Sequence, residues 1–180
     1  NDAMVTAARK VRRRRPRVEI PLDLLSNEIG KPTSGDIRVA QEIIKRTFEH
    51  FNIEVEMGDV SVGPTVTQFT FRPADGVKVS RITALHNDLA LALAAHPIRI
   101  EAPIPGKSLI GIEVPNQKVA VVRLREIFES DPFRKRQSSL AVALGKDVSG
   151  SAWIADIARM PHLLVAGSTG SGKSVMLNTI

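Results

Sequence analysis

Apolar residues recur with a helical period in the first half of the chain. Their spacing of three or four residues predicts a helix over about residues 35–51, with Thr33 or Ser34 as its N-cap. The apolar residues that form the predicted core stripe of this helix are Ile37, Ala40, Ile44, Phe48 and Phe51. A second pattern predicts a helix over about residues 80–95, which Pro97 ends because a proline disfavours helical backbone before it. Its predicted buried residues are Ile82, Leu85, Leu89, Ala92 and Leu93.

Shorter apolar segments, several of them alternating, predict strands between and after these helices. The expected strands are residues 53–57, 65–71, 98–100 and 109–114. Phe69 and Phe71 fall on the same face of the second strand, so we predict that both are core residues. The turn residues Gly63 and Pro64 precede that strand. Two helices with four or five short strands predict an α+β domain over residues 27–115.

The pattern changes after residue 115. An amphipathic stretch at 124–128 is followed by predicted strands at 140–144 and 153–155, and an apolar run of strand length follows at 163–166. This run leads into a glycine-rich segment, after which residues 175–177 open a helix. Strand, glycine-rich loop and helix in this order indicate the start of an α/β nucleotide-binding domain, which we predict for residues 116–180.

The glycine-rich segment fits the phosphate-binding pattern G-x-x-x-x-G-K-[ST]. Glycines allow a tight turn in which several backbone N–H groups converge on a phosphate. Lys173 is the candidate catalytic residue, which places a positive charge on the outer phosphates, and Ser174 is a candidate Mg²⁺ ligand because Mg²⁺ prefers oxygen. The pattern therefore predicts ATP or GTP with Mg²⁺. The candidate binding residues are Gly167, Ser168, Thr169, Gly170, Ser171, Gly172, Lys173 and Ser174.

The composition narrows the classes of protein that fit. At 180 residues and 43% apolar content, the chain has room for one domain and a piece of a second. The absence of cysteine excludes disulfides and thiolate metal sites and favours an intracellular protein. The four histidines lack metal-ligand spacing. The longest apolar run, residues 89–95, is far too short to span a membrane, so we expect a soluble chain.

The net charge of +6 resides in the N-terminal segment. Residues 1–18 contain seven Lys and Arg residues and one Asp, which leaves 18 basic and 18 acidic residues in the remaining chain. Like charges at this density repel one another, so we expect residues 1–26 to form a basic, disordered arm. Such an arm attracts DNA or an anionic membrane surface, or serves only as a solvated linker, and the sequence leaves these alternatives open.

Several runs of residues resemble the FtsK/SpoIIIE family of bacterial DNA translocases in one continuous register. The longest run, residues 160–174, reads MPHLLVAGSTGSGKS and includes the phosphate-binding pattern. The other runs that resemble the family are residues 62–67, 73–78, 88–94, 99–107, 111–116 and 142–147. The resemblance covers about residues 20–180, and it is far more specific than a phosphate-binding loop alone.

The resemblance implies an ATP-driven motor for double-stranded DNA in chromosome segregation at cell division or sporulation. Residues 27–115 would be its ring-forming α domain, and residues 116–180 would begin a RecA-like ATPase domain. Such proteins form a homo-hexamer around duplex DNA, and segments upstream of this chain would anchor the protein at the cytoplasmic face of the cell membrane. The family's DNA-gripping loops, second acidic motif, trans-acting arginine and γ domain are expected after Ile180, so only residues 167–174 carry over as a site.

The sequence leaves two alternatives open. The phosphate-binding loop also suits another ring ATPase, such as a conjugation coupling protein, which moves a different DNA substrate. Residues 27–115 also suit a non-enzymatic ring scaffold that guides DNA, because their charges nearly balance and they contain no cluster of catalytic residues. In each case we expect the 180-residue chain by itself to hydrolyse no ATP, because the loop lacks a complete flanking sheet.

Overall fold

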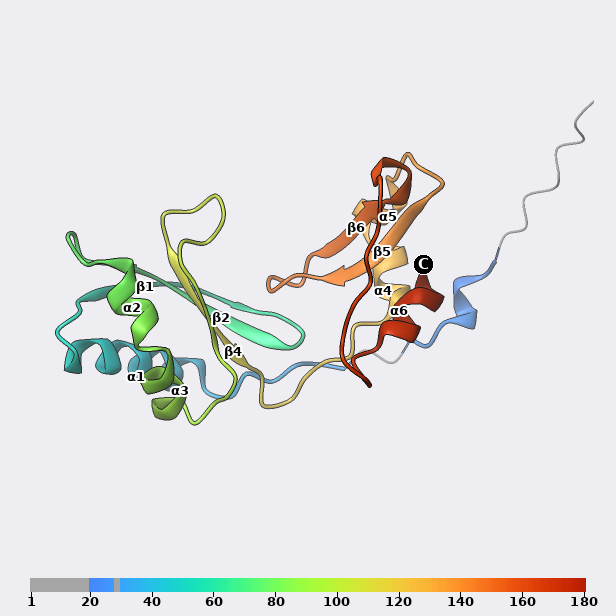
Figure 1. The fold of residues 1–180 in the computed structure, drawn as a ribbon. Coiled ribbons are helices and arrows are strands. Elements are labelled where there is room, and N and C mark those ends of the chain that lie inside the picture. Colours follow the sequence, from blue (N-terminus) through green and yellow to red (C-terminus); the bar gives the residue numbers. More distant parts are fainter. Residues whose placement is uncertain (1–19, 28–29) are drawn as a thin grey trace, which may run out of the picture.

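The computed structural model describes residues 20–27 and 30–180, which form two parts (Figure 1). The first part, residues 30–116, contains a sheet and three helices. The second part, residues 124–180, contains a two-stranded sheet and short helices, and residues 117–123 form the linker between the two parts. Of the predicted basic arm, residues 1–26, residues 1–19 lie outside the described residues, and Leu22–Leu24 form a short 3₁₀ helix, η1.

Helix α1, Ile37–His50, confirms the first predicted helix. Its N-cap is Asp36, whose carboxylate accepts hydrogen bonds from the backbone N–H groups two and three residues later, at 2.9 and 3.2 Å. The prediction of Thr33 or Ser34 as the cap is wrong. Gly35, with φ +77°, turns the chain immediately before Asp36, so the helix starts later than either candidate requires.

The predicted apolar stripe of α1 is confirmed along most of its length and is wrong at its end. Ile44 and Phe48 are completely buried, and Ile37 and Ala40 are half-buried against the core. Phe51 is the C-cap residue, and its side chain is 42% exposed. The helical spacing overextends the stripe because the helix ends one residue before Phe51.

Four antiparallel strands form the sheet of the first part, in the order β1-β2-β4-β3. Their bounds are Val55–Val62 for β1, Val66–Pro73 for β2, Arg99–Glu101 for β3 and Ile110–Pro115 for β4. The four predicted strands are therefore confirmed. β1 runs further than predicted, because a register shift between Met57 and Val60 interrupts the alternation on which the prediction rests.

The second predicted helix is divided into α2, Val79–Ala84, and α3, His86–Ala92. Leu85, between them, has φ −83° and ψ 12°, and its N–H bonds to the carbonyl three residues earlier at 3.1 Å. The helical period restarts after this break, so the buried alanine is Ala90, and the prediction of Ala92 is wrong. The remaining predicted core residues of this segment are buried or half-buried: Ile82, Leu85, Leu89 and Leu93.

Helix α3 ends at a left-handed residue, before Pro97 is reached. Ala94 has φ +47°, and its N–H bonds to the carbonyl of Leu91 at 3.1 Å. The N–H of Ala95 bonds to the carbonyl of Ala90, also at 3.1 Å. These two bonds form a Schellman motif, which satisfies carbonyl groups at the end of the helix and normally has glycine at the left-handed position.

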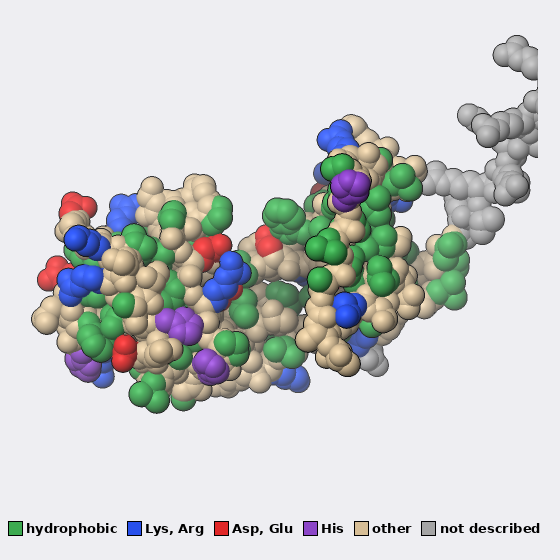
Figure 2. Space-filling view, in the orientation of Figure 1, with side chains coloured by type: hydrophobic (Ala, Val, Ile, Leu, Met, Phe, Trp, Pro, Cys, Tyr) green, Lys and Arg blue, Asp and Glu red, His purple; other side chains and the backbone are tan. Residues whose placement is uncertain are grey.

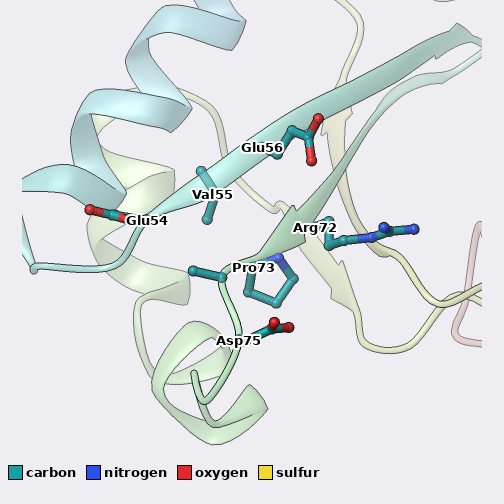
Figure 3. Close-up of a pocket in the computed structure, with 7 residues that line it drawn as sticks. Glu54, Val55, Glu56, Arg72, Pro73 and Asp75 are labelled. Carbon is teal, nitrogen blue, oxygen red and sulfur yellow. The ribbon is translucent and has the colours of Figure 1, made fainter.

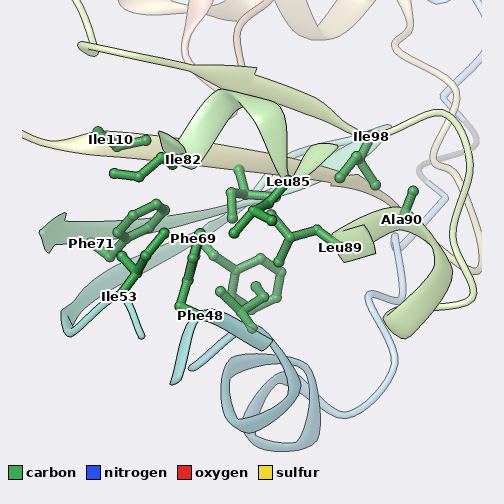
Figure 4. Close-up of a cluster of buried hydrophobic side chains, with 12 residues drawn as sticks. Phe48, Ile53, Phe69, Phe71, Ile82, Leu85, Leu89, Ala90, Ile98 and Ile110 are labelled. Carbon is green, nitrogen blue, oxygen red and sulfur yellow. The ribbon is translucent and has the colours of Figure 1, made fainter. Parts of the chain in front are cut away.

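The main core lies between the sheet and the three helices, where Figure 4 shows Phe48, Phe69 and Phe71 close together. The rings of Phe48 and Phe71 lie 5.0 Å apart between centroids, at an interplanar angle of 45°. The prediction that Phe69 and Phe71 are core residues is confirmed. The core residues are Ile44, Phe48, Ile53, Phe69, Phe71, Ile82, Leu85, Leu89, Ala90, Ile98, Ile110 and Ile112.

The second part is arranged around one hairpin. Its strands β5, Ala141–Lys146, and β6, Ala152–Asp156, pair antiparallel and confirm two predicted strands. The other elements of this part are α4, Leu124–Glu129; α5, Asp131–Arg134; η2, Ile157–Arg159; and α6, Lys173–Thr179. The short helix η1, Leu22–Leu24, precedes the first part in the chain and contacts the second part. An ion pair of 3.3 Å between Asp23 and Arg125 joins η1 to this part. Within residues 20–27 and 30–180, no helix combines the length and the apolar character that crossing a membrane requires.

The prediction of a strand at residues 163–166 is wrong. These residues adopt no regular structure, and the side chains of Leu163 and Leu164 are 45% and 88% exposed. A strand needs a neighbour to pair its backbone groups, and no strand in the described part of the chain pairs with this segment. Figure 2 shows that exposed apolar side chains gather over the second part.

We predict that Ala94→Gly stabilises the protein by about 0.5–1 kcal/mol. Relief of the left-handed strain contributes about 1–2 kcal/mol, and the greater freedom of glycine in the unfolded chain offsets part of it. Urea unfolding followed by circular dichroism measures the change.

The matched control is Ala92→Gly, at the exposed last residue of α3. Glycine at a right-handed helical position destabilises by about 1 kcal/mol, so the two substitutions should have opposite signs. Destabilisation by both would show that the left-handed backbone of Ala94 carries no strain.

Candidate nucleotide-binding site

The candidate phosphate-binding loop, residues 167–174, follows η2 and an irregular stretch and leads directly into α6 (Figure 1). Two of its glycines have left-handed backbone: Gly170 has φ +80° and Gly172 has φ +92°. Other residue types rarely adopt this conformation, so the glycines at these places are what permits the path of the loop. Gly172 is also the N-cap of α6.

The first glycine of the pattern allows the loop to fold back on itself. A Cβ atom at Gly167 would lie 2.3 Å from the Oγ atom of Ser171 and 3.5 Å from the Cγ atom of Lys173. The N–H of Ser171 bonds to the carbonyl of Ser168 at 3.2 Å and closes a turn within the loop. The two ends of the pattern, separate in the sequence, thus lie against one another.

Helix α6 starts at Lys173, as the sequence predicts for the residues after the loop. The first N–H groups of a helix have no partner within the helix and form its positive end. Lys173 and Ser174, the candidate catalytic residue and metal ligand, lie in this first turn and are exposed. All eight predicted binding residues therefore form one exposed loop and helix start.

The geometry of the loop fits the phosphates of a nucleotide. The left-handed backbone at Gly170 and Gly172 and the missing Cβ at Gly167 allow the tight turn that a phosphate-binding loop needs. The ammonium group of Lys173 and the hydroxyl of Ser174 supply a positive charge and an oxygen ligand at the same place. The donor set suits a phosphate with Mg²⁺.

An open pocket of about 450 Å³ lies in the first part, at the end of the β1–β2 hairpin that is away from its turn (Figure 3). Three carboxylates, those of Glu54, Glu56 and Asp75, line it together with one guanidinium group, that of Arg72. This charge balance disfavours a phosphate or a DNA backbone. Within residues 20–27 and 30–180, no group of three His, Cys, Asp or Glu side chains has the arrangement of a metal site.

Asp147, which no sequence pattern above singles out, organises the turn between β5 and β6. We call residues 147–151 the Asp147 loop. One carboxylate oxygen of Asp147 accepts the N–H groups of Ser149 and Ser151, each at 2.9 Å, and the Ser149 hydroxyl at 2.6 Å. The other oxygen accepts the indole Nε1–H of Trp153 at 3.2 Å. Aspartate followed by serine two residues later is a turn pattern that could reveal this role.

Opposing effects act on the pKa of Asp147. Burial raises the pKa because it disfavours the charged form, and hydrogen bonds from Ser149, Ser151 and Trp153 lower it by more. The pKa consequently lies below its ordinary value. The carboxylate is held in its charged form by the loop that it organises.

Two family models match the chain, one over the first part and one over the second. The model of the FtsK alpha domain matches residues 21–116, and the model of the FtsK/SpoIIIE family matches residues 123–180. The chain belongs to the FtsK/SpoIIIE family. The predicted fold class is confirmed: an FtsK-type α+β domain is followed by the first portion of a P-loop α/β domain.

Curated proteins of the FtsK/SpoIIIE family match over most of the chain. "DNA translocase FtsK" of Caldanaerobacter subterraneus subsp. tengcongensis is 51% identical over 162 residues, which are 89% of this chain and 23% of that protein. The protein of the same name from Listeria monocytogenes is 54% identical over 163 residues, 89% of this chain and 22% of that protein. The chain thus spans about a fifth of the length of these relatives.

One solved structure, the pCW3 conjugation coupling protein TcpA in a monomer form with ATPγS, is 20% identical. The alignment covers 78% of this chain and 40% of that chain, with a TM-score of 0.36. A score at this level carries no conclusion about fold or function, and the placement in the FtsK/SpoIIIE family rests on the sequence matches.

We predict that the indole N–H resonance of Trp153 titrates below the ordinary aspartate pKa of 3.8. Because the folded pKa of Asp147 is lowered, its stabilising effect is complete above the ordinary pKa and is lost as the pH falls through the folded pKa. Trp153 is the single tryptophan of the chain, so ¹⁵N–¹H correlation spectra report on this contact alone.

The control is Asp147→Asn, whose indole resonance should not move with pH over the same range. A wild-type midpoint at or above pH 3.8 would contradict the account of the Asp147 loop, since it would mean that the hydrogen bonds do not favour the charged form.

Proposed function

We propose that the protein of which this chain forms part is an ATP-driven translocase of double-stranded DNA that acts in chromosome segregation at cell division or sporulation. The observation that carries the proposal is the phosphate-binding sequence pattern, with left-handed backbone at Gly170 and Gly172, in a chain of the FtsK/SpoIIIE family. The curated relatives are named DNA translocase FtsK, which supports DNA as the partner and movement along DNA as the activity.

In this proposal residues 167–174 bind ATP with Mg²⁺. The backbone N–H groups of Gly167 to Gly172 orient the phosphates, Lys173 neutralises the charge of the outer phosphates, and the hydroxyl of Ser174 holds Mg²⁺. ATP supplies the free energy of phosphoanhydride hydrolysis. The exposed position of the loop leaves room for further residues to complete the site.

The first part, by contrast, acts as a scaffold without chemistry. We assign residues 27–115 to a ring-forming α domain, residues 116–180 to the start of a RecA-like ATPase domain, and residues 1–26 to a basic arm. Six subunits form a ring around duplex DNA, and segments upstream of this chain attach the protein to the cytoplasmic face of the cell membrane. Residues 27–115 contain 9 basic and 11 acidic residues, and this near balance supports guidance of DNA by this part over tight binding of phosphates.

ATP hydrolysis by the complete parent protein, with and without linear duplex DNA, tests the proposal. We expect duplex DNA to raise the rate at least tenfold and Lys173→Ala to reduce it to background, because the lysine charge is needed on the phosphates. Lys107→Ala removes another exposed lysine, in the loop between β3 and β4, and should keep the wild-type rate.

The 180-residue chain by itself should hydrolyse no ATP above background. Turnover by the purified chain that Lys173→Ala abolishes would show that the site is complete within these residues. Hydrolysis by the parent protein that ignores duplex DNA would contradict the translocase proposal and leave the nucleotide site standing.

A further inference from the structure

The turn between β1 and β2 is fixed by a buried hydrogen-bond network. The side chain of Asn116, 7% exposed, donates to the carbonyl of Gly63 at 2.9 Å and accepts the hydroxyl of Thr67 at 2.7 Å. Its backbone N–H bonds to the carbonyl of Thr65 at 2.9 Å. The N–H of Gly63 bonds across the turn to the carbonyl of Val66, also at 2.9 Å. The end of β4 therefore determines the position of the turn.

The same turn holds the start of the linker. The N–H of Ala120 bonds to the carbonyl of Pro64 at 2.8 Å, and the backbones of Thr33 and Lys118 exchange bonds of 2.9 and 3.1 Å. Ala120 is buried. The linker thus leaves the first part from beside the β1–β2 turn, at the end of the hairpin that lies nearer the second part in Figure 1.

Gly63 also touches the second part directly. A Cβ atom at Gly63 would lie 2.7 Å from the carbonyl oxygen of Val148 and 3.1 Å from its carbonyl carbon, and 3.0 Å from the carbonyl oxygen of Val66 within its own turn. Real Cβ atoms essentially never approach within 3.0 Å of another heavy atom, and the obstacle here is backbone, which cannot rotate away as a side chain would. Only glycine at position 63 allows the turn and the Asp147 loop to meet in this way.

Both sides of this contact are rigid. The Asp147 loop is held by four hydrogen bonds to one carboxylate and by backbone bonds of 3.0 Å from Asp147 to Ser151 and from Gly150 to Asp147. A cavity of about 240 Å³ beside the contact is lined from both parts, by Val62 and Pro64 on one side and Lys146 and Gly150 on the other. The Gly63–Val148 contact thus joins the two parts in addition to the linker and to the Asp23–Arg125 ion pair that holds η1 against the second part.

We propose that Gly63 is a positioning residue, whose missing side chain seats the first part on the Asp147 loop and so fixes its orientation relative to the phosphate-binding loop. The linker by itself permits rotation about its backbone bonds, and a contact between two hydrogen-bonded turns restricts that rotation. The Asp147 loop leads in the chain through β6 and η2 to residues 167–174. In the complete parent protein we expect the contact to couple the first part to the nucleotide site. Only this last consequence rests on the proposed function.

Distance measurements between two spin labels on the 180-residue chain test the proposal. The chain contains no cysteine, so Asp75→Cys and Gln137→Cys place one label on an exposed site of each part. We expect a single narrow distance distribution for the otherwise unchanged chain. Gly63→Ala should make the distribution at least twofold wider, because the added methyl group separates the turn from Val148.

The matched control is Gly30→Ala. Its Cβ atom would lie 3.7 Å from the Cα atom of Ala120, an ordinary van der Waals distance beside the same linker, so the distribution should stay narrow. Asp147→Ala loosens the contact from the opposite side, leaves the first part unaltered, and should also widen the distribution. Amide exchange in β2 and β4 shows whether Gly63→Ala disturbs the sheet. If it does, the distance distribution of Asp147→Ala decides whether the contact fixes the orientation of the first part.

A wide distance distribution in the unchanged chain would overturn the proposal. So would distributions that stay as narrow as in the unchanged chain both in Gly63→Ala, with its sheet folded, and in Asp147→Ala. In the complete parent protein, Gly63→Ala should keep the rate of ATP hydrolysis measured without DNA and lose at least tenfold in DNA movement per ATP. If the unchanged parent protein ignores duplex DNA, the proposed function fails, and the label distances still decide the role of Gly63.

Discussion

Asn116 satisfies the polar groups at the place where the sheet, the β1–β2 turn and the linker meet. Its buried amide pairs with the carbonyl of Gly63 and the hydroxyl of Thr67, and loss of one partner from such a pair costs about 1–3 kcal/mol because the other remains buried and unpaired. The bonds that fix the linker start from the same turn. The network therefore positions the first part's side of its contact with the Asp147 loop.

The candidate nucleotide site has a different physical basis. Its eight residues are exposed, and its shape comes from the backbone freedom of glycine, with left-handed conformations at Gly170 and Gly172. Little of the main core supports it directly. Residues 163–166 precede it in the chain, and they lack a strand partner in the described part of the chain. This contrast explains why we expect the loop to need more of the parent protein before it catalyses.

Local patterns predict much of this structure. Helix α1, the four strands of the first sheet, β5, β6 and the start of α6 all follow from apolar spacing and turn residues, and the phosphate-binding pattern predicts which residues form one loop. Predictions fail where distant contacts decide: the break at Leu85, the bulge in β1, and the unpaired segment at 163–166. The contact of Gly63 with Val148 joins residues 85 positions apart, and no pattern in the nearby sequence predicts it. The family resemblance predicts duplex DNA as the partner and movement along it as the activity, neither of which follows from apolar spacing.

Displacement of a third DNA strand tests the central claim, that this chain belongs to a motor moving along duplex DNA. The complete parent protein would be given linear duplex DNA that carries a labelled triplex-forming strand away from its ends. We predict ATP-dependent release of that strand by the wild-type protein and no release by Lys173→Ala. ATP hydrolysis by the wild-type protein without release of the third strand would contradict the account, because it would show a nucleotide site that does not drive movement.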